Sequence, residues 1–433
     1  MFNSYLFKSY RVWLVLGLLL LVLIAAESVA LHSVFTSKYP GANDFFVRWL
    51  GGRALILHGV NPFDRSVAEE AQKAMFGRLA RPTDKDEAYF AYPLYTLYFF
   101  WPLSLVRYDW AQAIWMTLLQ FMLLAVTLLS IHLSGWRPPR GLFVATILWG
   151  IVFYNGARAI ILGQFSVLVG LALLLALAAI AHRRDNWAGV LLAATTIKPQ
   201  MVFLALLFIL LWALFNRRQR IVVSFGLSLA ALILSSMLLV PRWPLDFVIN
   251  IFAYSEYVQH GTPLENLLHY FLPPASAGLL TPVLSLLFFG ALLPGWWLAI
   301  KGRPGAYTWA LLSTLIVGSL ITFRSATTNQ VILYLPLFFF FYRLALLCPS
   351  NQAVGRSSHL HCAQAQVFVI RHSSFVILVG LFISMWIVFA ITLVGNYENI
   401  MLHGLLPALL LALYTLDWRG LWRAAESLEQ VTL

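Results

Sequence analysis

The stretch LGQFSVLVGLALLLALAAIAHRRDNWAGVLLAATTIKPQ (162–200) decides the class of fold. It holds a continuous, leucine-rich apolar run over 165–181, the basic linker HRRD (182–185) and a second apolar run over 187–197. Membrane-spanning helices need roughly 17–25 mostly apolar residues, whereas transmembrane β-barrels show short segments of alternating hydrophobicity. The stretch therefore predicts membrane helices that are joined by basic linkers.

The whole chain repeats this pattern. Of its 433 residues, 61% are hydrophobic and 11% are charged, against about 25% charged residues in soluble domains. The expected fold class is an all-α polytopic membrane protein with about 11–13 transmembrane helices, forming a single membrane domain over 1–433. Candidate spans are roughly 12–35, 91–106, 109–133, 141–157, 165–181, 187–197, 200–215, 221–240, 276–300, 305–322, 328–347, 373–394 and 400–416.

The net charge of +12 comes from 29 Lys and Arg against 17 Asp and Glu. The basic residues stand in short clusters between apolar runs, which is the positive-inside pattern of membrane proteins and not that of a nucleic-acid-binding surface. The clusters predicted to be cytoplasmic are 182–185, 216–220, 301–303, 343–372 and 418–423. Loops 36–90 and 241–275 then lie outside. Cys348 and Cys362 both fall in the 343–372 loop and indicate no disulfide framework.

This orientation leaves one inconsistency in the first half of the chain. Three candidate spans, 91–106, 109–133 and 141–157, separate the outer loop 36–90 from 165–181, although the charges require an even number. Either one of the three is re-entrant or broken, or the assignment of the linkers to the two sides is wrong.

A second irregularity lies at Lys198-Pro199. The apolar run 187–197 corresponds to only about 16 Å of helix, and 200–215 returns to the same basic side. Two short helices that meet at a charged, proline-marked break predict a discontinuous hairpin. Irregular backbone at membrane depth is tolerated only against protein or a wet cavity.

Asp44 follows the first span closely, at the expected outer membrane surface. The stretch behind it, FFVRWLGGRALILHG, carries Arg48 and Arg53 and predicts an amphipathic helix in the interface plane. One interpretation makes Asp44 the N-cap or first-turn acid of that helix. The other makes it a general base that takes the proton from an acceptor hydroxyl at the lipid–water boundary.

Basic residues away from the cytoplasmic clusters complement this carboxylate. Arg158, Lys198 and Arg324 are candidates for binding the phosphate of a lipid, and snorkelling or helix capping is the alternative role for each. Glu27 lies within the first span, where an acid is either functional or paired with an arginine. The chain has no Walker A loop, HExxH motif or Cys/His metal cluster, so neither a cofactor nor a metal is expected.

Several short motifs follow one another over about 40–220. They are Asp44 with the run GVNPFD (59–64), Tyr92-Pro93 within AYPLYTLYFFWPLSLV (91–106), and Gly163-Gln164 and Lys198-Pro199 within 162–200. Their order resembles glycosyltransferase family 87, whose members have the GT-C membrane fold, and the resemblance fades over 221–433. Ser166 and Phe63 depart from the family pattern, which often has Asn and Tyr there.

The resemblance implies a function and a layout. Segment 12–220 becomes a GT-C core with a catalytic outer loop at 36–90, followed by C-terminal helices over 221–433. The enzyme takes a sugar, by default mannose, from a polyprenyl-phosphate donor. It transfers that sugar with inversion to a lipid or glycan acceptor at the outer face of the cytoplasmic membrane. Asp44 occupies the position of the general base.

The expected site follows from both lines of reasoning. Its residues are Asp44 as catalytic base; Lys198, Arg158 and Arg324 at the donor phosphate; and Gln164, Asn61, Arg48, Tyr92, Glu256 and His260 at the substrates. Two other classes remain open at this point: a transporter or lipid flippase, favoured by the Lys198 break and Glu27, and a non-catalytic envelope scaffold. The acid-bearing loop 36–90 favours the enzyme.

Overall fold

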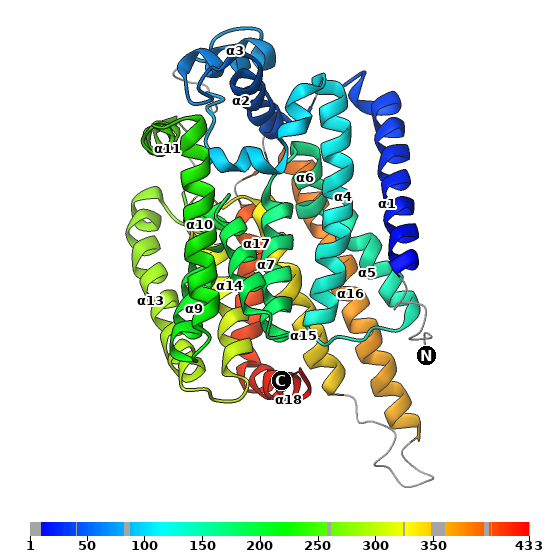
Figure 1. Ribbon diagram of the computed structural model, residues 1–433. Helices are drawn as coiled ribbons and strands as arrows, with labels where there is room; N and C mark the ends of the chain where they lie inside the picture. Colours follow the sequence, from blue (N-terminus) through cyan, green and yellow to red (C-terminus); the bar gives the residue numbers. More distant parts are fainter. Residues whose placement is uncertain are drawn as a thin grey trace. The chain divides into compact units, whose positions relative to one another are not determined.

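The structure, a computed structural model, describes residues 10–39, 41–81, 87–257, 261–323, 325–347, 360–393, 398–399 and 401–432. Every regular element in these ranges is helical (Figure 1). The elements up to residue 195 are α1 (Tyr10–Leu31), the π-helical turn η2 (His32–Thr36), α2 (Asn43–His58), α3 (Arg65–Phe76), the 3₁₀ helices η3 (Leu94–Phe99) and η4 (Trp101–Leu105), α4 (Tyr108–Leu133), α5 (Arg140–Val152), α6 (Tyr154–Leu162), α7 (Ser166–Ala181) and α8 (Asp185–Thr195). The later elements are α9 (Pro199–Phe215), α10 (Gln219–Leu239), α11 (Trp243–Tyr257), α12 (Pro263–Phe271), α13 (Pro274–Ile300), α14 (Ala306–Ile321), the 3₁₀ helix η5 (Thr327–Leu333), α15 (Tyr334–Leu346), α16 (Leu360–Thr392), α17 (Leu402–Leu416) and α18 (Trp418–Thr432).

The predicted all-α polytopic membrane fold is confirmed. In the described part of the chain, six helices are long and apolar enough to cross a membrane, or seven with one bent pair, fewer than the eleven to thirteen spans predicted. The six are Val12–Thr36, Tyr108–Leu133, Gln219–Leu239, Pro274–Ile300, Thr327–Leu346 and Ser373–Thr392. Four of the five shorter apolar helices of 10–17 residues coincide with candidate spans and account for most of the difference, because the sequence count treated such short runs as spans.

The contacts within the chain group it into two compact units. Unit 1 contains Met1–Met122, Ile160–Gln164 and Ser236–Val258, and unit 2 contains Leu123–Ala159, Phe165–Ser235 and Gln259–Leu433. The prediction of one membrane domain with a core over 12–220 stays a prediction.

The prediction that one early segment fails to cross stays a prediction, and 91–106 is the early candidate span that does not form an α-helix. This segment forms the two short 3₁₀ helices η3 and η4, and Pro93 and Pro102 remove backbone donors at their starts. It packs against α2 in unit 1, where the indole of Trp49 donates to the carbonyls of Leu103 and Val106 at 3.0 and 3.2 Å. The helix pair α5–α6 is also broken, by 41° near Phe153.

The break at Lys198-Pro199 is confirmed. Helix α8 ends at Thr195, Lys198 has the non-helical angles φ −133° and ψ 72°, and α9 begins at Pro199. Proline suits the first position of a helix, because the N–H that it lacks has no partner there. Predicted loop 343–372 is shorter than expected, because α16 already begins at Leu360.

Close packing within unit 2 depends on Gly189 of α8. An added Cβ there would lie 2.5 Å from the carbonyl oxygen of Ile221 and 2.6 Å from the backbone nitrogen of Phe225, both on α10. Backbones that approach this closely are typical of membrane helices that meet at small residues. Asp185 and Arg218 form an ion pair near the ends of the same two helices.

Replacement of Gly189 by alanine tests this packing. We expect Gly189→Ala to destabilise the protein by about 1–3 kcal/mol, because the clash involves backbone atoms that have little freedom to move. Thermal unfolding of the detergent-purified protein measures the effect. The matched control is Gly226→Ala on α10, where an added Cβ meets nothing within 4 Å. An equal change in the two variants would contradict the close approach.

Candidate functional site

Asp44 lies in the first turn of α2, as one of the two sequence interpretations expected. Ala42, just before the helix, adopts the left-handed angles φ 53° and ψ 47°. The Tyr108 hydroxyl holds this turn, with its oxygen 2.5 Å from the Gly41 carbonyl and 2.9 Å from the Ala42 carbonyl. The direction in which Asp44 enters the helix is therefore set by α4.

The Asp44 carboxylate has two neighbours in unit 1 that were both expected at the substrates. The Gln164 amide donates to Oδ2 of Asp44 at 2.7 Å. Arg48, one helical turn on, donates to the Asp44 backbone carbonyl at 2.7 Å, and its guanidinium lies 3.9 Å from Oδ1. The Arg48 side chain is 10% exposed and that of Asp44 is 32% exposed. The carboxylate is thus held on one oxygen and remains partly accessible.

Tyr92 completes this group, which we call the Asp44 cluster (Asp44, Arg48, Tyr92 and Gln164). Its hydroxyl donates to Oε1 of Gln164 at 3.4 Å, and the Arg48 guanidinium lies 4.4 Å from the centre of its ring. Burial raises the pKa of Tyr92 to about 12, with a lowering contribution from Arg48 and a raising one from Asp44. The hydroxyl therefore keeps its proton at neutral pH, and by donating to Oε1 it orients the Gln164 amide group toward Asp44.

Gly163 allows Gln164 to reach Asp44. It has φ 69°, which favours glycine, and an added Cβ would lie 2.6 Å from Cβ of Phe45 and 3.1 Å from Cβ of Ala42. The Trp115 indole donates to the Gly163 carbonyl at 2.9 Å. The Gly-Gln pair thus has a physical reason: only glycine lets this turn lie against the start of α2.

Asn61 has a different environment in unit 1. Its amide donates to Asp246 of α11 at 2.8 Å, and its Oδ1 accepts the Phe63 backbone N–H at 3.1 Å. Asn250 of α11 donates to the Phe63 carbonyl at 3.3 Å. Asn61 therefore shapes the 59–64 turn and joins it to α11.

The expected phosphate-binding residues that the structure describes, Lys198 and Arg158, belong to unit 2. Lys198 is 6% exposed at the α8–α9 break. The Nε of Arg158, on α6, lies 3.2 Å from Oε2 of Glu398. Arg324 and His260 lie outside the described residues, as does the side chain of Glu256.

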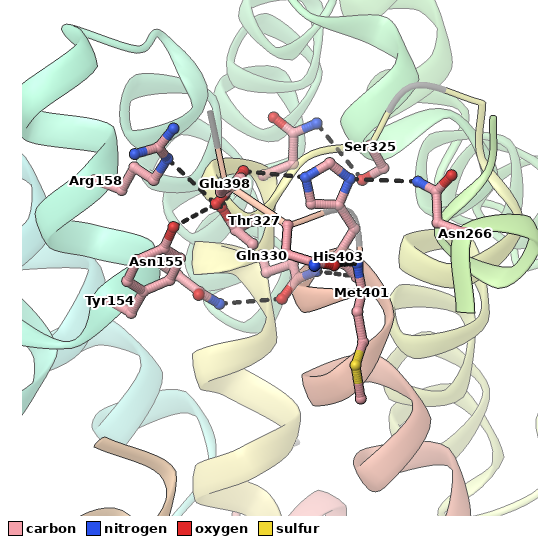
Figure 2. A network of polar contacts seen from close by, with 12 residues as sticks. Tyr154, Asn155, Arg158, Asn266, Ser325, Thr327, Gln330, Glu398, Met401 and His403 are labelled. Carbon is pink, nitrogen blue, oxygen red and sulfur yellow. Dashed lines mark hydrogen bonds and ion pairs between the residues drawn. The ribbon is translucent and has the colours of Figure 1, made fainter. Parts of the chain in front are cut away.

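Glu398 forms the centre of a polar cluster that the sequence did not reveal (Figure 2). We call it the Glu398 cluster: Tyr154, Arg158, Thr327, Glu398 and His403. The Tyr154 hydroxyl donates to Oε2 at 2.5 Å, the Thr327 hydroxyl lies 2.9 and 2.8 Å from the two oxygens, and Nε2 of His403 lies 3.0 Å from Oε1. The only sequence signal was an isolated acid five residues before a histidine, because the other partners are far away along the chain.

The charge state of Glu398 follows from these contacts. Burial alone raises its pKa, but the hydrogen bond and charge of His403, the charge of Arg158 and the hydrogen bond from Tyr154 together lower it to about 2. The carboxylate is therefore ionised at neutral pH.

The described residues contain no group of three or more acidic, histidine or cysteine side chains arranged to hold a metal ion. What the Asp44 cluster can supply is a partly exposed, oriented carboxylate, which is suited to accept a proton. A polytopic membrane protein with such a site fits the class of membrane-embedded enzymes.

The chain belongs to glycosyltransferase family 87, whose model matches residues 90–347. The family predicted from the sequence is thereby confirmed, and the protein is a membrane glycosyltransferase of the hexosyltransferase type. No curated protein and no solved structure matches the chain. The matched range includes Tyr92, Arg158, Gln164 and Lys198, whereas Asp44 and Glu398 lie outside it.

The lowered pKa of Glu398 predicts a pH-dependent contribution to stability. Because the folded-state pKa lies below the ordinary 4.5, this contribution is complete above about pH 5 and declines as the pH falls through 4.5 toward 2. We expect Glu398→Gln to lower the unfolding temperature by several degrees at pH 7, and the difference from wild type to shrink as the pH is lowered toward 4.

Thermal scans of the purified protein across this pH range measure the difference. Glu69→Gln is the control, because it removes an exposed ion pair with Arg65, whose side chain is 83% exposed, and such pairs contribute little. If the difference in unfolding temperature between wild type and Glu398→Gln stays constant with pH, the lowered pKa of Glu398 is contradicted.

Proposed function

We propose that this glycosyltransferase moves a sugar, mannose by family default, from a polyprenyl-phosphate donor to a lipid or glycan acceptor. The transfer takes place at the outer face of the cytoplasmic membrane and inverts the anomeric centre. The observation that carries the proposal is the hydrogen bond from Gln164 to Asp44 at 2.7 Å. It fixes one carboxylate oxygen and leaves the other to accept a proton.

Asp44 serves as the general base in this mechanism. Its Oδ1 takes the proton of an acceptor hydroxyl as the hydroxyl oxygen attacks the anomeric carbon of the donor. The bond from that carbon to the phosphate oxygen breaks, and polyprenyl phosphate leaves with the electron pair. Because a phosphate is a stable anion at neutral pH, its departure needs no acid, so a single carboxylate suffices.

Gln164 and Tyr92 orient the base, and Arg48 contributes a further donor. Nε of Arg48 is buried and has no hydrogen-bond partner among the described residues. A buried donor without a partner costs free energy, and a substrate oxygen would satisfy it. This supports a substrate contact for Arg48 in addition to its bond to the Asp44 backbone.

The donor phosphate is assigned to Lys198, with help from Arg158 and Arg324. The support for Lys198 is its burial at a break between two apolar helices. A buried ammonium group at such a break is suited to a charge-assisted contact with a phosphate. Glu256 and His260 are assigned to the acceptor because they lie in the aromatic-rich segment 241–275. Asn61 acts on the substrates through the 59–64 turn that it shapes.

Replacement of the base gives the most direct test. We expect Asp44→Asn to lower kcat by about 10²–10⁴-fold without reducing donor binding, because the amide cannot accept the proton. Release of polyprenyl phosphate from a polyprenyl-phosphate sugar, in the presence of acceptor, measures the rate. The control is Asp64→Asn, which changes an exposed acid at the start of α3 that makes no side-chain capping bond.

Transfer at the wild-type rate by a folded Asp44→Asn variant would falsify the assignment of the base. Movement of the intact lipid across vesicles, unaffected by Asp44→Asn, would instead indicate a flippase activity.

A second test concerns the donor phosphate. We expect Lys198→Met to raise the KM for the donor roughly tenfold or more, since a charge-assisted contact is lost, and to leave the KM for the acceptor nearly unchanged. Steady-state kinetics with each substrate varied in turn measures both constants. Lys301→Met, on an exposed turn after α13, is the control. Equal increases in both KM values would argue against a phosphate contact.

A further inference from the structure

The Glu398 carboxylate joins residues of three helical segments of unit 2. Tyr154 and Arg158 come from α6, Thr327 from the start of η5, and His403 from α17 (Figure 2). The Glu398 side chain is 10% exposed and that of Arg158 is 14% exposed. Tyr154, Thr327 and His403 form hydrogen bonds to the carboxylate, and Arg158 forms an ion pair with it. Contacts from several sides therefore fix the position of the Glu398 carboxylate.

His403 contributes to the cluster through one ring nitrogen, Nε2, which lies 3.0 Å from Oε1 of Glu398. The Asn266 amide nitrogen lies 3.4 Å from the other ring nitrogen, Nδ1. Tyr154 and Thr327 contribute neutral hydroxyl donors. Arg158 places a permanent positive charge beside the Glu398 carboxylate.

The ion pair between Arg158 and Glu398 is recorded at Nε of the guanidinium. The Nε–Oε2 distance is 3.2 Å, and the guanidinium carbon lies 5.5 Å from the centre of the Phe389 ring. Figure 2 shows the terminal nitrogens of Arg158 pointing away from Glu398. Those nitrogens form the part of a guanidinium that pairs with two oxygens of a phosphate.

Stability alone does not explain such a cluster. Buried ion pairs are often no more stabilising than well-packed apolar residues of the same volume. A network of hydrogen bonds and ion pairs does, however, restrict its members to one geometry. Anion-binding groups that are held by a surrounding shell bind with less loss of side-chain freedom.

We propose that Glu398 is a positioning residue for Arg158, holding the guanidinium by Nε so that its terminal nitrogens meet the phosphate of the lipid-linked donor. This inference rests on the proposed function, in which Arg158 contacts that phosphate. Glu398 itself touches neither substrate.

Direct binding tests the proposal without knowledge of the sugar or the acceptor. The probes are polyprenyl phosphate and the uncharged polyprenol of the same chain length, titrated into the purified full-length protein. We expect Arg158→Gln to weaken binding of the phosphate at least tenfold and to leave polyprenol binding unchanged. Glu398→Gln should show most of the same loss. The double variant should bind no worse than Arg158→Gln alone, because Glu398 acts through Arg158.

Two further variants separate positioning from general damage. Asp185→Asn breaks another largely buried ion pair of unit 2, with Arg218, and should leave phosphate binding unchanged. Thr327→Val removes one neutral donor, keeps both charges of the pair and should cause a loss of a few-fold. This milder variant also keeps the test decisive if Glu398→Gln fails to fold.

Three outcomes would overturn the inference. If Arg158→Gln weakens phosphate binding but Glu398→Gln and Thr327→Val do not, Glu398 has no positioning role and the proposed function is unaffected. If the Glu398 variants weaken phosphate and polyprenol binding equally, or if the losses add in the double variant, Glu398 acts independently of Arg158. If Arg158→Gln changes nothing, the phosphate contact of Arg158 itself fails, and the inference fails with it.

Discussion

Polar groups in this chain must find their partners within the protein, because the lipid around a membrane helix offers none. With only 11% charged residues, the consequence is that polar side chains gather at a few places. The Asp44 and Glu398 clusters are two such places. In each, a carboxylate accepts hydrogen bonds from residues that are distant along the chain. The need for hydrogen-bond partners within the protein explains how the nearby helix ends and turns are arranged.

The two clusters satisfy that requirement to different degrees. Glu398 is surrounded by donors and is nearly buried, so its charge is balanced and its position is determined. Asp44 accepts one strong hydrogen bond and remains about one-third exposed. A carboxylate that is saturated can hold a neighbour in place, whereas one that is only oriented can still exchange a proton. The difference in partners thus separates a positioning role from a catalytic one.

Interruptions of regular helix mark the sites of interest. The left-handed residues Ala42 and Gly163 bring the start of α2 and Gln164 together in unit 1. The break before Pro199 places Lys198 between two apolar helices in unit 2. Such irregular backbone is tolerated in a membrane protein where side chains or backbone groups can satisfy it. Functional side chains are found at these positions because non-helical backbone can place them where a regular helix cannot.

The sequence by itself determined the helical membrane class, the family and the break at Lys198-Pro199. These properties follow from local composition, from charge spacing and from proline, all of which act over a few residues. It also singled out Asp44, Arg48, Tyr92 and Gln164, but as one base and three substrate contacts. Only the tertiary structure decided that these four residues form a single hydrogen-bonded cluster, that Asn61 is bonded to α11, and that Glu398 gathers Arg158 and His403. The hydrogen bonds Tyr92–Gln164, Gln164–Asp44, Asn61–Asp246 and Tyr154–Glu398 join residues 72 to 244 positions apart, and no local pattern encodes a distance of that kind.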